Sequence, residues 1–339
     1  MRPLFLFLLA IAQYQTTQPQ EFRAVGIGFY NVENLFDTID NPTTYDEDYT
    51  PSGKLRWTPE KFHQKIEHIG RVIARIGNEN HVHGPSLLGL CEIENKHVLT
   101  ELVQSPILSP LVYGFIHFEG PDRRGIDVAL LYRKKHFQPL TVKRYRLELK
   151  NVRQFPIPTR EQLVVHGILW DQEVTVLVNH WPSRRGGRKK SAPLRVAAAQ
   201  LQLRILDSIY TENPKARILV MGDFNDNPMD ASVKSLTQKN TYYPHFKPLQ
   251  NPLLPLSKKG IGSLAHRDLW HLFDQILLSS RWYDDPDFFF VTAKVYNPKW
   301  LQTPLGRFKG YPFRSRYSDY HFSGFSDHFP VYVLLALRQ

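Results

Sequence analysis

The chain has 339 residues, of which 42% are hydrophobic, 22% charged and 13% aromatic, a composition typical of a globular protein and not of a disordered one. The formal net charge of +11 and the isoelectric point near 9.5 favour an anionic partner such as nucleic acid, a phosphorylated small molecule or an acidic membrane surface. Cys91 is the only cysteine, which excludes an intrachain disulfide and any zinc cluster held by several thiolates, and its position between Leu90 and Glu92 predicts a buried strand thiol.

The N-terminus has the pattern of a cleaved secretory signal. Arg2 supplies a positive charge, residues 4–12 are uninterrupted apolar sequence, and Ala10-Ile11-Ala12 matches a small-x-small cleavage site. The apolar run is too short to span a bilayer. We therefore expect a signal peptide over 1–12, a linker over 13–22 and a single domain over 23–339, in a secreted or periplasmic protein.

Hydrophobic patterns predict the main elements of this domain. Thr58-Pro59-Glu60 marks a helix start, and a stripe of apolar residues at three- and four-residue steps continues it to about Ile76. A second helix is predicted over 191–210. The segment 240–266 is rich in Pro, Gly and Lys and is expected to be an irregular surface excursion. Short apolar runs predict strands, in chain order, over 24–30, 86–92, 111–118, 126–132, 163–170, 174–179, 217–221, 272–278 and 329–335.

Polar side chains close or interrupt these apolar strands at six places. They are Asn31, Glu92, His180, Asp223 with Asn225, Asp274, and Asp327 with His328. In an extended segment Asp223 and Asn225 would face one point, where a carboxylate takes a proton or holds a cation and a carboxamide donates to an anion. Taken singly, such residues are as well explained by turns and surface salt bridges. A carboxylate buried like Asp274 needs a partner, and a histidine is the obvious one.

Two further stretches carry candidate substrate contacts. In the segment 299–323 aromatic residues alternate with basic ones, among them Tyr311 and Arg314. Protein surfaces that bind single-stranded nucleic acid, unstacked bases or polar lipid headgroups have this composition. A packed irregular loop would explain it equally well. Arg124 lies in the loop of a predicted hairpin, and Trp181 and Arg184 follow His180. These five residues are the candidate phosphate or substrate contacts.

Taken in order, the strand-end residues resemble the endonuclease/exonuclease/phosphatase superfamily, in a secreted bacterial branch. The sequences that carry the resemblance are Phe29-Tyr30-Asn31-Val32-Glu33-Asn34, Leu90-Cys91-Glu92, Asn179-His180-Trp181-Pro182, Gly222-Asp223-Phe224-Asn225, Phe273-Asp274-Gln275-Ile276-Leu277-Leu278-Ser279 and Ser326-Asp327-His328. The likeness runs from about Val25 to Val333. It implies a four-layered α/β sandwich of the DNase I-like type, with two mixed sheets face to face, helices outside and the site at one rim.

The resemblance also implies roles for individual residues. Glu92, Asn31 and Asp327 would hold a divalent metal, Mg²⁺ or Mn²⁺ with Ca²⁺ as a further option. Asp223 would orient or deprotonate the attacking water, and Asn225 would contact the phosphoryl oxygens. His328, steered by Asp274, would hydrogen-bond the scissile phosphate, with His180 on the other side. The catalytic set is therefore Asp223, Asn225, His180, His328 and Asp274.

The sequence leaves the substrate open. The first hypothesis is a secreted nuclease that cleaves phosphodiester bonds by in-line attack of water, acting as a monomer. The alternative is a phosphodiesterase or phosphatase on lipid headgroups or small phosphoesters, because basic charge serves both equally well. A non-catalytic binding protein on the same scaffold is disfavoured, since the set of polar strand ends is complete.

Overall fold

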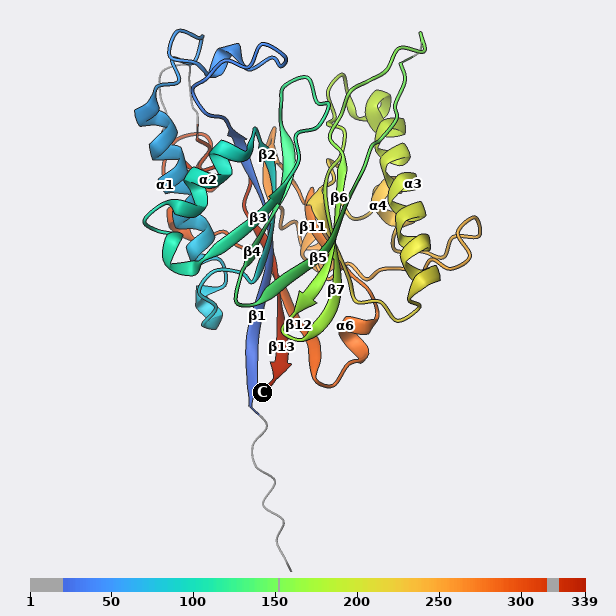
Figure 1. The fold of residues 1–339 in the computed structure, drawn as a ribbon. Helices are drawn as coiled ribbons and strands as arrows, with labels where there is room; N and C mark the ends of the chain where they lie inside the picture. Colours follow the sequence, from blue (N-terminus) through green and yellow to red (C-terminus); the bar gives the residue numbers. More distant parts are fainter. Residues whose placement is uncertain (1–20, 152, 316–322) are drawn as a thin grey trace, which may run out of the picture.

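The computed structural model describes residues 21–151, 153–315 and 323–339. The expected signal peptide and most of the linker lie outside these residues, as does the segment 316–322 of the aromatic and basic stretch. The described strands form two large sheets that pack face to face, with helices on the outer faces (Figure 1). The predicted four-layered α/β sandwich is confirmed.

Each sheet mixes parallel and antiparallel pairs. The six-stranded sheet has the order β12 (Phe288–Val295), β13 (Val331–Arg338), β1 (Phe22–Leu35), β2 (Leu87–Ile93), β4 (Asp127–Arg133), β3 (Tyr113–His117). The five-stranded sheet has the order β11 (Asp274–Leu278), β8 (Ile218–Asp223), β7 (Gln172–His180), β6 (Gln162–Leu169), β5 (Phe137–Tyr145). A small hairpin joins β9 (Leu264–His266) to β10 (Leu269–His271).

The main core lies between the two sheets. The central strands β1, β2, β7 and β8 are buried over most of their length, as their continuous apolar sequence predicts. Gly89 in β2 allows the two sheets to approach closely, because a Cβ at this position would lie 2.6 Å from the Sδ of Met221 in β8. Burial of this apolar surface is the main driving force for the sandwich.

Helices cover both outer faces (Figure 1): α1 (Pro59–Arg75) and α2 (Lys96–Gln104) pack on the six-stranded sheet and α3 (Arg188–Glu212) on the five-stranded sheet. The predicted helix starts at Thr58 and Pro59, and its predicted apolar stripe is buried. Shorter helical segments are α4 (Ala231–Ser235), α5 (Leu254–Lys258), α6 (Arg281–Asp284), η1 (Glu47–Tyr49), η2 (Asn78–Asn80), η3 (Ser109–Leu111) and η4 (Lys299–Leu301). None of the helices described is long and apolar enough to cross a membrane.

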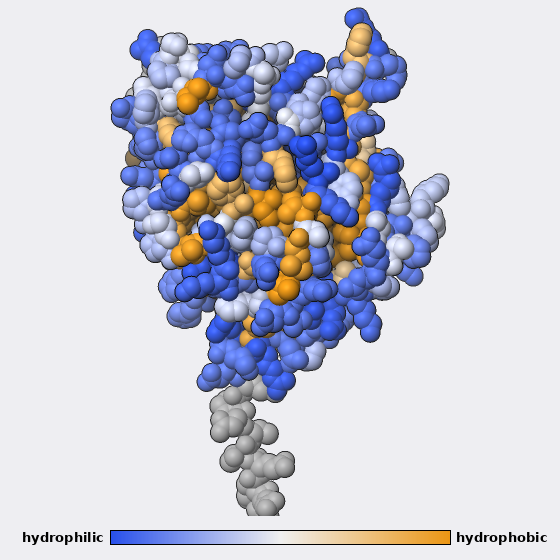
Figure 2. All heavy atoms as spheres, in the orientation of Figure 1, coloured by the Kyte–Doolittle hydropathy of each residue, from blue (hydrophilic) through white to orange (hydrophobic). Residues whose placement is uncertain are grey.

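Strand β5, which the sequence analysis did not predict, forms the edge of its sheet. Pro139 lies within it, and the pairing with β6 shifts register between Pro139 and Thr141. Prolines and bulges of this kind protect an exposed edge from pairing with another chain. Figure 2 shows a band of apolar residues across the middle of the face on which β3 and β5 lie, bounded by polar residues above and below. At this edge the guanidinium of Arg144 lies 5.4 Å from the ring centre of Phe118.

The strand registers bring the polar strand ends to one rim of the sandwich, the upper rim in Figure 1. β1 and β2 are parallel and pair Asn31 with Cys91, while β7 and β8 are parallel and pair His180 with Asp223. The antiparallel strand β11 pairs Asp274 with Asp223. Carboxyl ends of parallel neighbours share one edge of a sheet, so these side chains meet there.

A buried ion pair anchors the loop after β8 to α3. Arg195 is 0% exposed and its Nε lies 2.8 Å from Oδ2 of Asp226, which also accepts a hydrogen bond from Ser232 Oγ at 2.7 Å. Arg195 Nη1 donates to Ser191 Oγ at 3.0 Å. Because Asp226 directly follows Asn225, this pair holds the end of the site loop in place.

Replacing Arg195 with alanine should lower the free energy of unfolding by about 3 kcal/mol, because the buried Asp226 carboxylate loses its buried counter-charge and keeps only its pair with the partly exposed Arg184 among the residues described. The matched variant Arg188→Ala removes a guanidinium that is 64% exposed and pairs with Asp230, and it should cost at most about 1 kcal/mol. Chemical denaturation measures both. Equal losses in the two variants would show that the buried pair contributes nothing specific.

Candidate active site

Asp223 lies at the centre of the polar rim. Its Oδ2 accepts a hydrogen bond from Asn31 Nδ2 at 3.1 Å, and its Oδ1 accepts one from the backbone N–H of Asn225 at 2.9 Å. The side chain is buried, and this burial, together with the neighbouring charge of Asp274, raises its pKa to about 6. A carboxylate with this pKa is ionised at neutral pH yet more basic than an exposed one.

Asn225 is held differently from the prediction. We expected an extended segment in which Asp223 and Asn225 face one point, but Asn225 has a left-handed backbone with φ of 51°. Its Nδ2 donates to the backbone carbonyl of Trp181 at 3.1 Å. Among the residues described, the second N–H of this amide has no partner and can donate to a substrate oxygen.

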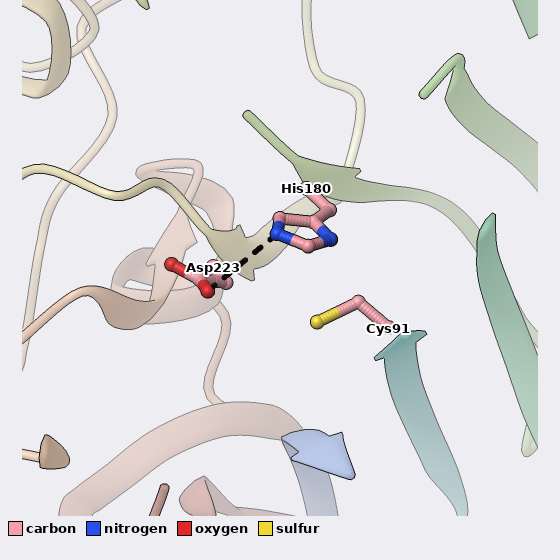
Figure 3. Close-up of side chains that lie close together, drawn as sticks. All are labelled: Cys91, His180 and Asp223. Carbon is pink, nitrogen blue, oxygen red and sulfur yellow. Dashed lines mark ion pairs between the residues drawn. The ribbon is translucent and has the colours of Figure 1, made fainter. Parts of the chain in front are cut away.

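His180 lies beside Asp223 as a neutral imidazole. Its Nε2 is 3.8 Å from Asp223 Oδ2, and its Nδ1 has no hydrogen-bond partner among the residues described. Figure 3 shows the ring next to both Asp223 and the thiol of Cys91. Burial, followed by the positive charge of Arg160, lowers the pKa of His180 well below its ordinary value.

His328 carries the opposite charge state. Its Nδ1 is 2.6 Å from Asp274 Oδ2, so the predicted pairing of Asp274 with a histidine is confirmed. Burial by itself would lower the pKa of His328, but the carboxylates of Asp274, Asp327 and Asp223 outweigh it and raise the pKa well above its ordinary value. Ser263 Oγ also donates to Asp274 Oδ2 and fixes its orientation. The imidazolium can therefore donate a hydrogen bond from Nε2.

The oxygen donors predicted for a metal lie on the six-stranded sheet and its adjoining loop. Glu92 Oε2 accepts a hydrogen bond from Asn34 N at 2.9 Å, and Asn31 Oδ1 accepts one from Glu33 N at 3.0 Å. The Asp327 side chain is 41% exposed, and its Oδ1 is 4.0 Å from His328 Nε2. Carboxylate and amide oxygens are ligand types that Mg²⁺ and Mn²⁺ prefer, and both ions usually retain several waters.

Four residues that are not glycine adopt left-handed backbone around this rim. Glu33, Asn34, Glu92 and Asn225 have φ between 51° and 64°. Such conformations cost on the order of 1 kcal/mol each and persist where the surroundings hold them. The strained positions flank the side chains that define the site.

Two of the predicted substrate contacts, Trp181 and Arg184, make their contacts within the protein. Trp181 is 1% exposed, packs edge-on against Phe224 and donates from Nε1 to Asn179 Oδ1. Arg184 donates to the carbonyl of Asn225 at 2.8 Å and pairs with Asp226 and Asp230. Both therefore support the loop that carries Asn225 and offer little surface to a ligand.

The other three predicted contacts lie on the surface. Arg124 has a side chain 44% exposed, 3.7 Å from Asp122. Arg314 is 49% exposed and bridges Glu33 at 2.9 Å and Asp327 at 3.4 Å. Tyr311 donates from its hydroxyl to Asp268. All three remain reachable by a substrate at the rim.

Arg160 and Glu33 support the site but were not singled out in the sequence. Arg160 is buried, pairs with Asp122 at 2.9 Å and donates to the carbonyl of Trp181 at 2.8 Å, which places its charge near His180. Glu33 accepts hydrogen bonds from the backbone N and the hydroxyl of Ser315, both at 2.7 Å. The position of Glu33 two residues after Asn31 was a usable signal, while nothing in the sequence around Arg160 marks it.

Comparison with known proteins identifies the family. The model of the endonuclease/exonuclease/phosphatase family matches residues 26–337. The chain belongs to this family. Its members are phosphoester hydrolases that depend on divalent metals, so the chain is an enzyme of this class and the resemblance seen in the sequence is confirmed. Among curated protein sequences, none matches the chain.

Solved structures of the family share the fold at low sequence identity. The human Nocturnin catalytic domain with bound sulfate is 16% identical, with a TM-score of 0.55 over 93% of this chain and 97% of that one. A mannosyl-6-phosphatase from Bacteroides thetaiotaomicron is 17% identical, with a TM-score of 0.52 over 92% and 99%. TDP2 from D. rerio, complexed with a single-strand DNA product, is 15% identical, with a TM-score of 0.53 over 92% and 98%.

The charge state of His328 provides a test of the site. In Asp274→Asn the buried imidazole loses the first of its three carboxylate partners and its hydrogen bond, while burial still disfavours the charge, so the pKa of His328 should fall. NMR titration should show His328 protonated at pH 7 in the parent protein and a lower pKa in the variant. The matched variant Asp287→Asn, at a surface pair with Arg338, should leave the titration unchanged. A neutral His328 in the parent at pH 7 would contradict the assignment.

Proposed function

We propose that the chain is a metal-dependent phosphodiesterase that cleaves nucleic acid by direct attack of water on phosphorus. The observation that carries this proposal is the arrangement around Asp223. This base of raised pKa has the neutral His180 on one side, and the cationic His328 lies nearby in the same cluster. A phosphoester hydrolase needs both a group that takes a proton from water and a positive donor for the phosphate oxygens.

In this proposal each residue has a defined role. Asp223, oriented by Asn31 and by the backbone of Asn225, accepts the proton of the attacking water. His328, held by Asp274, donates from Nε2 to a phosphoryl oxygen, and Asn225 and His180 contact the remaining oxygens. Glu92, Asn31 and Asp327 hold the divalent cation, which when bound neutralises charge on the scissile phosphate.

A row of aromatic side chains next to His328 favours nucleic acid as the substrate. Phe329 follows His328 and stacks with Trp270 at a centroid distance of 6.1 Å and an angle of 13°. Tyr311 lies 5.6 Å from Trp270, and Phe308 lies 5.6 Å from Tyr311. Trp270 is 39% and Phe308 45% exposed, and the guanidinium of Arg307 lies 5.7 Å from the Phe308 ring centre. Exposed rings beside a cation suit bases attached to phosphates.

The second candidate is hydrolysis of lipid headgroups or small phosphoesters. This candidate is supported by the mannosyl-6-phosphatase from Bacteroides thetaiotaomicron, which has the same fold. The fold by itself therefore does not determine the substrate. The net charge of +11 suits either anionic substrate.

A substrate panel with and without chelator tests these roles. With Mg²⁺ or Mn²⁺ we expect cleavage of single- and double-stranded DNA or RNA, abolished by EDTA, and weaker action on phospholipid and sugar phosphate. Asp223→Ala and His328→Ala should each lower kcat/KM by roughly 10²–10⁴-fold, while Asp287→Asn should retain the parent activity.

The variant Glu92→Gln tests the proposed metal site. It should raise the Mg²⁺ concentration needed for half-maximal activity about tenfold or more without unfolding the protein. Cleavage of a phospholipid or sugar phosphate without any cleavage of nucleic acid would reject the nuclease in favour of the second candidate. Normal turnover in both alanine variants would overturn the catalytic roles.

We further propose that the protein is exported and acts as a monomer. The support for export is the signal-like sequence of residues 1–12. Expression of the full chain followed by cell fractionation should place a shortened protein in the periplasm or medium, and size-exclusion chromatography with light scattering should give one chain per particle. An unprocessed protein in the cytoplasm would reject export.

A further inference from the structure

A second cluster of metal-binding side chains lies deeper in the rim. Cys91 on β2, His180 on β7 and Asp223 on β8 each direct a side-chain atom to one point, and the three atoms lie within 4.8 Å of one another (Figure 3). All three side chains are buried. The cluster forms because β2 of one sheet faces β7 and β8 of the other at the rim where these strands end.

The donor set differs in kind from that of the Mg²⁺ or Mn²⁺ site. Glu92, Asn31 and Asp327 offer oxygen atoms, whereas the deeper cluster offers sulfur, nitrogen and oxygen. Thiolate and imidazole favour Zn²⁺ and related borderline metals over Mg²⁺. Three protein ligands with a fourth position open to the site are the usual number for a zinc ion that also meets water or substrate.

His180 provides an independent indication of a ligand. Its side chain is 3% exposed, its Nδ1 has no hydrogen-bond partner in the described part of the chain, and its Nε2 is 3.8 Å from Asp223, too far for a hydrogen bond. Buried polar atoms without a partner are uncommon and call for an explanation. A cation held by Nε2, the Cys91 thiol and the Asp223 carboxylate would give this buried ring a polar contact, while Nδ1 would stay without a partner among the residues described.

The distances and charges are compatible with a bound zinc ion. Ligand atoms in a tetrahedral zinc site lie roughly 3.4–3.8 Å apart, so small side-chain shifts would bring the three donors into place. On binding, the Cys91 thiol loses its proton to solvent, and the resulting thiolate and the Asp223 carboxylate together match the double positive charge. Asp223 Oδ2 would then exchange its contact with Asn31 for the metal.

We propose that Cys91, His180 and Asp223 form a zinc site whose occupation inhibits the hydrolase. Zinc held there occupies Asp223 and His180, so the water can no longer be deprotonated by Asp223 and the phosphate loses a contact. The inhibition rests on the proposed function of these two residues, whereas the binding of zinc does not.

Binding is tested first, without reference to activity. Co²⁺, added to the metal-free full chain as a spectroscopic substitute for Zn²⁺, should give a sulfur-to-metal charge-transfer band that saturates at one ion per chain and is displaced by Zn²⁺. Because Cys91 is the only cysteine, a thiolate band can arise from no other residue. The band should vanish in Cys91→Ser and Cys91→Ala. A folded parent protein that shows no such band with stoichiometric Co²⁺ would overturn the site.

Inhibition is tested second, on the substrate that the parent protein cleaves with Mg²⁺. Zn²⁺ should inhibit the parent, and Cys91→Ser should raise the inhibitory Zn²⁺ concentration roughly tenfold or more while keeping Mg²⁺-supported activity within about twofold. Cys91→Ala serves the same purpose if the serine variant does not fold. Equal inhibition of parent and variants would reject the regulatory role. If no phosphoester is cleaved at all, the proposed function fails, and the Co²⁺ band still decides the metal site.

Discussion

Two carboxylates of like charge, Asp223 and Asp274, face each other across adjacent strands of a buried sheet edge. Burial and the neighbouring charge of Asp274 raise the pKa of Asp223. Asp274 contacts the imidazole of His328 and accepts a hydrogen bond from the hydroxyl of Ser263. Asp223 accepts hydrogen bonds from the amide of Asn31 and from the backbone N–H of Asn225. The two carboxylates therefore differ in their partners, and this difference supports the proposed role of Asp223 as the base.

The rim is also where the two sheets are joined by polar contacts, in contrast to the apolar interior between them. Asn31 of the six-stranded sheet reaches Asp223 of the five-stranded sheet, and Ser326 Oγ donates to the carbonyl of Asn31 at 2.7 Å. Lys65 of α1, fully buried, donates to the carbonyls of Glu33 and Phe325 and so ties the end of β1 to the loop before β13. The oxygen donors proposed for the metal come mainly from one sheet, and the groups proposed for proton transfer come mainly from the other. The relative position of the sheets therefore sets the geometry of the reaction centre.

Much of this could be predicted from the sequence because the information is local. Apolar runs located the central strands, and the polar residue ending each run located the rim. Strands β5 and β12 and helix α2 were missed: β5 contains a proline and alternates with exposed polar residues, and α2 spans only nine residues. The side-chain environments of Trp181 and Arg184 could not be predicted, since burial of a tryptophan or pairing of an arginine depends on segments distant in sequence. The same holds for Arg160, which meets Asp122 and Trp181 only in the folded chain.

The left-handed residues at the rim have a consequence for how this site can change. At Glu33, Asn34, Glu92 and Asn225 a glycine would relieve backbone strain, and the folded state would gain on that account. At Glu33, Glu92 and Asn225 such an exchange would also delete a side chain that supports the rim or has a proposed role in it, whereas at Asn34 the backbone N–H that contacts Glu92 would remain. These three strained positions are therefore places where the fold gives up stability for the proposed chemistry.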